Sequence, residues 1–160
     1  MSRLEELSAA AREAQRNADV VAVERIAREL ADVAVQSGEP IVEANALAYL
    51  GGALVARNDG RGAREAFERS RAIMEEAGDE AGVVRALSGL GVVALDIELD
   101  AAAARAYLDV ALAAARRIDD PRGLGQVLGN LAEVQRYEAD YRGEEYPATR
   151  PRPSACGELT

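Results

Sequence analysis

The chain lacks several residue types on which catalytic and metal sites commonly depend. All 19 of its basic residues are arginines, because the sequence contains neither lysine nor histidine. Without histidine there is no imidazole for a catalytic triad or for metal ligation. Without lysine there is no amine for Schiff-base chemistry or for a phosphate-binding P-loop. We therefore expect a protein that is not an enzyme and that carries no cofactor and no metal.

Cysteine and long apolar runs are also scarce. Cys156 is the single cysteine, so an internal disulfide cannot form. No stretch approaches the roughly 18 consecutive apolar residues of a membrane span, and the first residues are charged instead of forming an apolar leader core. These features predict a cytoplasmic protein without membrane contact. The arginine-only, alanine-rich composition is typical of a GC-rich bacterial genome.

Acidic side chains exceed basic ones. The 28 aspartates and glutamates give a formal net charge of -9 and a pI of about 4.7. A chain of this charge is repelled by phosphate backbones, so nucleic acid is a poor candidate partner.

Apolar residues recur three or four positions apart along most of the chain, which predicts amphipathic helices. Glycine, proline, asparagine and aspartate interrupt the pattern at regular intervals and mark the turns. The expected helices cover residues 3–17, 20–36, 40–57, 62–76, 80–97, 101–117 and 121–137. We predict an all-α domain of about seven helices over residues 1–140. Residues 141–160 lose the pattern and contain three prolines, which predicts a disordered tail.

The segment 42–82 is the template of an internal repeat. At one constant offset along the chain, large apolar residues recur as large apolar residues and small residues recur as small ones. The matched pairs are Leu47 and Leu87, Leu50 and Leu90, Gly51 and Gly91, Ala63 and Ala103, Ala66 and Ala106, and Phe67 and Tyr107. A weaker copy precedes the template, and an offset longer by one leads from Leu90 to Leu131. The sequence therefore predicts three helical hairpins and a seventh helix.

These motifs resemble the tetratricopeptide repeat family, in a long bacterial variant of about 40 residues per repeat. The resemblance implies a right-handed α-solenoid of antiparallel helical hairpins. The small residues at Gly51 and Gly91 leave room for a facing helix. Phe67 and Tyr107 are expected to fill the wedge between successive hairpins.

The resemblance also implies a function, namely binding of a protein or peptide in a concave groove lined by the first helix of each hairpin. Mapping the repeat onto that face predicts the partner-binding residues. They are Asn45, Tyr49, Gly52, Arg85, Ser88, Val92, Gln126, Asn130 and Glu133, with Ser8, Arg12 and Arg136 on the same face. Among these residues Tyr49 is the expected aromatic anchor.

Two other functions remain open. An apolar end near Leu124, Leu128 and Leu131 would favour a homodimer. Alternatively, the chain is a regulatory or sensor segment of a larger bacterial signalling or transcription-regulatory protein.

Overall fold

Seven α-helices and one short π-helical segment make up the part of the chain that the computed structural model describes, residues 1–141. In chain order the elements are α1 (Arg3–Arg16), α2 (Val20–Ser37), α3 (Pro40–Ala56), α4 (Gly60–Ala77), α5 (Glu80–Val92), η1 (Val93–Ile97), α6 (Ala101–Arg117) and α7 (Pro121–Tyr141). These residues contain no strand, which confirms the predicted all-α fold. The rest of the predicted tail, residues 142–160, lies outside the described range. Within that range, none of the helices combines the length and apolar character needed to span a bilayer.

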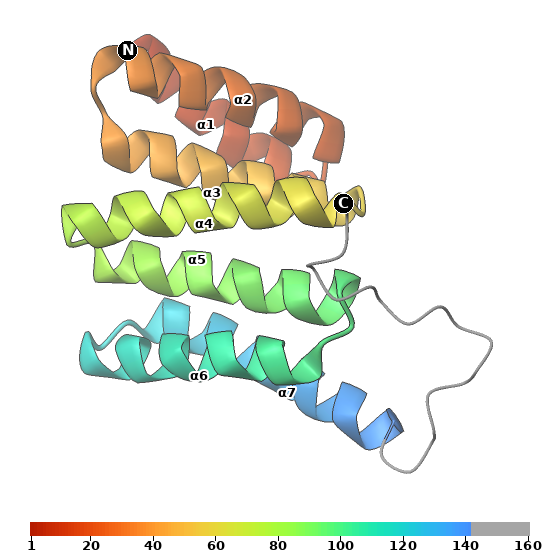
Figure 1. The fold of residues 1–160 in the computed structure, drawn as a ribbon. Coiled ribbons are helices and arrows are strands. Elements are labelled where there is room, and N and C mark those ends of the chain that lie inside the picture. Colours follow the sequence, from red (N-terminus) through yellow and green to blue (C-terminus); the bar gives the residue numbers. More distant parts are fainter. Residues whose placement is uncertain (142–160) are drawn as a thin grey trace, which may run out of the picture.

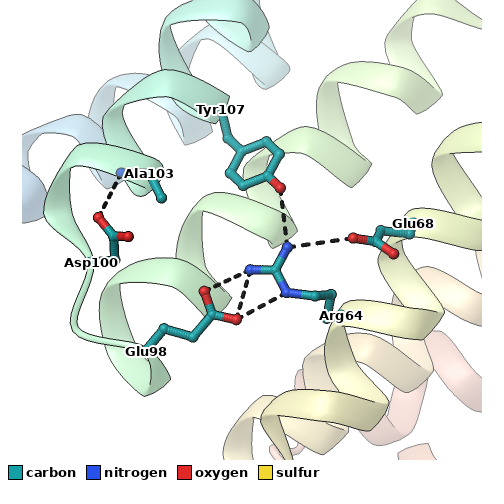
Figure 2. A network of polar contacts seen from close by, with 6 residues as sticks. All are labelled: Arg64, Glu68, Glu98, Asp100, Ala103 and Tyr107. Carbon is teal, nitrogen blue, oxygen red and sulfur yellow. Dashed lines mark hydrogen bonds and ion pairs between the residues drawn. The ribbon is translucent and has the colours of Figure 1, made fainter. Parts of the chain in front are cut away.

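Aspartate side chains start most of the helices. The Asp19 carboxylate accepts a hydrogen bond from the backbone N–H of Ala22 at 2.9 Å, and Asp59 does the same for Gly62. Asp100 accepts from the N–H of Ala103 (Figure 2). Such caps satisfy a backbone donor that has no partner inside the helix, and each contributes about 1 kcal/mol.

The helices stack in chain order and form two layers (Figure 1). Each helix packs against the next. In addition, α1 contacts α3, α3 contacts α5 and α5 contacts α7, whereas the described helices α2, α4 and α6 make no comparable contacts with one another. The first helices of the hairpins (α1, α3 and α5) and α7 therefore lie closer together than the second helices (α2, α4 and α6) do. One face of this helical repeat is thus more closely packed than the other.

The side chain of Phe67 fills the space between successive hairpins. A methyl group added at Gly51 of α3 would lie 2.7 Å from the Phe67 ring, and one added at Gly89 of α5 would also collide with this ring. Both glycines thus accept the aromatic side chain of α4, and Phe67 is only 6% exposed. The predicted role of Phe67 as a wedge is confirmed.

In the third hairpin this place belongs to Leu108, and the prediction for Tyr107 is wrong. A methyl group at Gly91 would lie 2.8 Å from Cγ of Leu108, whose side chain is 1% exposed, while Tyr107 is only partly buried. Likewise Ala104, and not Ala103, is the fully buried small residue. The repeat offset is thus one residue longer from Phe67 to Leu108 than from Gly51 to Gly91.

The extra residue is taken up by η1. Its hydrogen bond from the N–H of Glu98 to the carbonyl of Val93, at 3.2 Å, closes a wider turn than an α-helix has. Helical periodicity at residues 93–97 still resembles an α-helix, so the sequence showed the extra residue only as the longer offset from Leu90 to Leu131 and did not locate it. After η1 the longer offset persists, because the step from the cap at Asp59 to the cap at Asp100 exceeds that from Asp19 to Asp59 by one.

The Arg64 side chain of α4 contacts residues of η1's C-terminal end and of α6 (Figure 2). Its guanidinium donates to both carboxylate oxygens of Glu98, at 2.7 and 2.6 Å, and to the Tyr107 hydroxyl at 3.1 Å. It also lies 3.4 Å from the carboxylate of Glu68. Burial lowers the pKa of the Arg64 guanidinium, but the hydrogen bonds that it donates to Glu98 and Tyr107 outweigh burial and raise the pKa overall. Tyr107, which is partly buried against two core clusters, thus also helps to join α4 to η1 and α6.

Glycine-to-alanine substitutions at two adjacent positions test the packing of Phe67. Gly51→Ala should destabilise the fold by about 1–3 kcal/mol, because the new methyl group must displace the ring. Gly52→Ala should stabilise it by about 0.5–1 kcal/mol, because its methyl group meets nothing within 4 Å and alanine favours the helix. Urea denaturation of both variants measures the difference. Equal stabilities would contradict the wedge.

A double-mutant cycle tests the ion pair between Arg64 and Glu98, whose side chains are 21% and 22% exposed. We expect a coupling free energy of about 1–2 kcal/mol between Arg64→Gln and Glu98→Gln, above the value for exposed surface pairs. Chemical denaturation of the two single variants and the double variant gives this coupling. The exposed pair of Arg61 and Glu65 is the matched control, and equal couplings for the two pairs would refute the expectation.

Candidate functional site

Two adjoining cavities hollow the face formed by the first helices of the hairpins. Their volumes are about 460 and 520 Å³, within the range typical of ligand pockets. Both are lined by the same five residues, namely Asn45, Tyr49, Arg85, Arg122 and Gln126. We call the combined space the groove.

Residues far apart in the sequence line the groove. Ser8 and Arg12 of α1 line the same cavity as Arg122 and Gln126 of α7, and α3 and α5 lie between these helices. A single hollow therefore crosses four helices, α1, α3, α5 and α7. This requires the face to curve inward, because helices on a flat face would lie too far apart to share a cavity.

The repeat places equivalent residues side by side in the groove. Asn45 and Arg85 are one repeat apart, and the Arg85 guanidinium donates a hydrogen bond to the Asn45 side-chain oxygen at 3.2 Å. Gln126, the equivalent residue after a further repeat, also lines both cavities. The cap at Asp120, whose carboxylate accepts from the N–H of Gly123 at 3.0 Å, starts α7 in the register that brings Gln126 there.

The lining is rich in arginine. Arg12, Arg85 and Arg122 line it, and Asp120 is the one carboxylate among the lining residues of the described chain. Arg85 lies 3.9 Å from the Asp79 carboxylate, a long ion pair. Neither Arg12 nor Arg122 forms an ion pair with any residue within 1–141.

Most of the residues predicted for partner binding lie in the groove. They are Ser8, Arg12, Asn45, Tyr49, Gly52, Arg85, Val92 and Gln126. Tyr49 is half-buried: it lines both cavities and also packs against two core clusters. It combines a contact surface with a fixed position.

Ser88, Asn130 and Glu133 do not line either cavity. Ser88 is fully buried, and its hydroxyl has no hydrogen-bond partner among the described residues. The reason is the central place of α5, which contacts α3, α4, α6 and α7 and is covered on several sides. A pattern that assumes one covered stripe assigns Ser88 to the surface. Asn130 is half-buried, with its side-chain nitrogen enclosed and likewise unpaired within that range.

The groove also contains residues that the sequence reasoning missed. Arg122 lines both cavities, and Gln15 and Gly89 line the second one. Arg122 lies four residues before Gln126 and therefore on the same helix face. That spacing is the signal that would have found it.

Glu133 belongs to a separate cavity of about 390 Å³ between η1 and the last turns of α7. Arg136, predicted on the groove face, lies there too and forms an ion pair with Glu133. Burial raises the pKa of the Asp96 carboxyl in this cavity, although the residue as a whole is exposed, and the Glu133 carboxylate raises it further. The two acids thus repel each other.

Within residues 1–141, no group of three or more histidine, cysteine, aspartate or glutamate side chains is placed so that it could hold a metal ion. The groove instead offers guanidinium groups, carboxamides, one phenol ring and apolar side chains. This set suits the binding of polar and charged groups through hydrogen bonds and ion pairs.

Neither models of known protein families nor curated proteins match this chain. Function is therefore inferred from the geometry and the chemistry of the groove.

Replacing Asp96 tests the repulsion in the smaller cavity. Because its pKa is raised in the folded state, the ionised carboxylate costs stability above that pKa, and the cost disappears as the pH falls toward the ordinary value of about 3.9. Asp96→Asn should therefore raise the melting temperature at neutral pH and lose this advantage in acid. Melting curves across this pH range measure the effect, with Glu76→Gln on exposed α4 surface as the control for net charge. A variant no more stable than wild type at neutral pH would rule out the repulsion.

Proposed function

We propose that this chain is a non-catalytic interaction module that binds a segment of a protein, or a peptide, in the groove. The observation that carries the proposal is that one hollow is lined by α1, α3, α5 and α7 together. A groove that crosses four helices suits an elongated ligand, which can contact each helix in turn.

We further propose that the fold is an α-solenoid of the tetratricopeptide type. The nearly constant repeat offset, the antiparallel hairpins and the contacts between first helices support this assignment. So does the pairing of a glycine in one helix with a bulky side chain in the next, as at Gly51 and Phe67.

The lining residues favour binding over catalysis. Among the described residues that line the groove, Ser8 is the only serine or threonine. Activation of such a hydroxyl needs a neighbouring base. The one carboxylate in the lining, Asp120, already caps α7. Arginine and carboxamide side chains hold ligands by several directed hydrogen bonds at once.

Self-assembly through the end of the stack is a second candidate function. Leu128 of α7 is 46% exposed, and Gly125 and Gly129 beside it have open space around them. However, Leu131 is 8% exposed and belongs to the core. The exposed apolar area at this end is therefore small, and we rank self-assembly below binding in the groove.

Blocking the groove with a bulky side chain tests the proposed function. A random peptide library displayed on phage is selected on the immobilised wild-type chain, and the affinities of the selected peptides are then measured by fluorescence anisotropy. Gly52→Trp should abolish their binding and leave the helical circular dichroism unchanged, because the new side chain projects into open space in the groove.

Gly129→Trp is the matched control. It also replaces a helical glycine with open space around it, but it lies outside the groove lining. This variant should bind the selected peptides like wild type. If no peptide is selected, or if Gly52→Trp binds as well as Gly129→Trp, the groove is not the binding site. A loss of binding in Gly129→Trp alone would favour the end of the stack.

A further inference from the structure

We infer that the groove is selective for an acidic ligand, a peptide segment that carries several aspartate or glutamate side chains. This inference rests on the proposed function and specifies the chemistry of the partner. Three observations support it: the sign of the charge in the groove, the absence of ion-pair partners for two of its arginines, and the spread of these arginines over different helices.

The charge of the groove is opposite to that of the chain as a whole. The chain carries 28 acidic and 19 basic residues, whereas the lining holds Arg12, Arg85 and Arg122 against the single carboxylate of Asp120. Arginines gathered in a hollow with low-dielectric walls produce a focused positive potential. The groove is therefore a local attractor for carboxylates on an otherwise acidic surface.

Two of the three guanidinium groups have no carboxylate partner. Elsewhere most arginines are matched, as in the pairs of Arg57 with Glu24 and Arg105 with Glu138. Within residues 1–141, Arg12 and Arg122 are exposed and form neither an ion pair nor a side-chain hydrogen bond. A guanidinium presents donors in a planar fork that fits a carboxylate with two parallel hydrogen bonds. These donors remain available to a ligand.

The third arginine, Arg85, has two weak contacts that a ligand can replace. Its hydrogen bond to Asn45 is to a neutral amide, and its distance of 3.9 Å from Asp79 is at the outer limit of an ion pair. A ligand carboxylate can replace either contact with a shorter, charge-assisted bond. Arg85 can therefore engage a ligand without leaving a buried charge unpaired.

Arg12, Arg85 and Arg122 come from three helices and line one cavity, which favours a ligand with several carboxylates. Arg12 lies on α1, Arg85 on α5 and Arg122 on α7, and α3 lies between α1 and α5. The carboxamides of Asn45 and Gln126 stand among them and match the donors and acceptors of a peptide backbone. A long polyanion such as nucleic acid would extend beyond the groove and be repelled by the chain, whose net charge is -9.

The test uses the phage-displayed random peptide library and the double variant Arg12→Gln/Arg122→Gln. Peptides selected on the wild-type chain should be enriched in aspartate and glutamate over the naive library. Replacing these residues with asparagine and glutamine should weaken binding by about tenfold or more, as expected when charge-assisted hydrogen bonds are lost. The double variant should show a loss of similar size, and the affinity of the wild-type chain should fall with added salt.

The matched control is Arg25→Gln/Arg116→Gln. It changes the net charge by the same amount at two exposed arginines that also lack an ion pair within the described residues but lie outside the groove. It should bind the selected peptides within about twofold of wild type, since exposed charges at a distance are screened by salt.

Selected peptides that are blocked by Gly52→Trp but are not acidic would overturn this inference and leave the proposed function standing. The same holds if both double variants bind alike. Phosphoserine versions that bind more than about tenfold tighter than the carboxylate versions would replace the acidic segment with a phosphorylated one. Failure to select any peptide would instead refute the proposed function itself.

Discussion

The Phe67 ring lies where Gly51 and Gly89 carry no side chain, and this contact joins α3, α4 and α5. With aromatic residues at 4% of the composition, most of the core consists of alanine, leucine and valine, which fill space only when helices approach closely. The glycines permit that approach. The same closeness brings the first helices of successive hairpins into mutual contact and curves their face. The groove is thus a consequence of how the core is packed.

The π-helical segment η1 keeps this arrangement continuous across a change in repeat length. One extra residue lies between Gly91 and Asp100, and the wider turn takes it up before α6 begins. As a result Leu108 takes the place that Phe67 has in the preceding hairpin. Helix α7 then follows in register, and Gln126 reaches the groove. The pairing of Arg64 with Glu98, just after η1, fixes the end of this segment against α4 (Figure 2).

Ion pairs and caps account for much of the chain's charge outside the groove. Aspartates such as Asp19 and Asp59 cap helices, and many glutamates pair with arginines on the exposed surface. Exposed pairs contribute little stability each. In the groove the balance is different, since Arg12 and Arg122 line the cavity and form no ion pair with any described residue. Arginine therefore occurs in two different surroundings, mostly paired with carboxylates on the surface and largely unpaired in the groove.

The sequence by itself determined the helices, their order and part of the groove lining. These depend on local periodicity, on turn residues and on a repeat offset, all of which can be counted along the chain. Asn45, Tyr49 and Arg85 were found in this way, because equivalent positions of a repeat lie side by side once the hairpins stack.

The tertiary structure alone decided which residues the neighbours cover. Ser88 is buried because α5 is surrounded by other helices, and Glu133 lies in a different cavity because α7 extends beyond the groove. The exchange of Tyr107 for Leu108 has a similar origin, since a one-residue insertion leaves the pattern of apolar residues nearly unchanged while rotating the next helix by about 100°. Periodicity records which face of a helix is apolar, but burial depends on how many other helices pack around it.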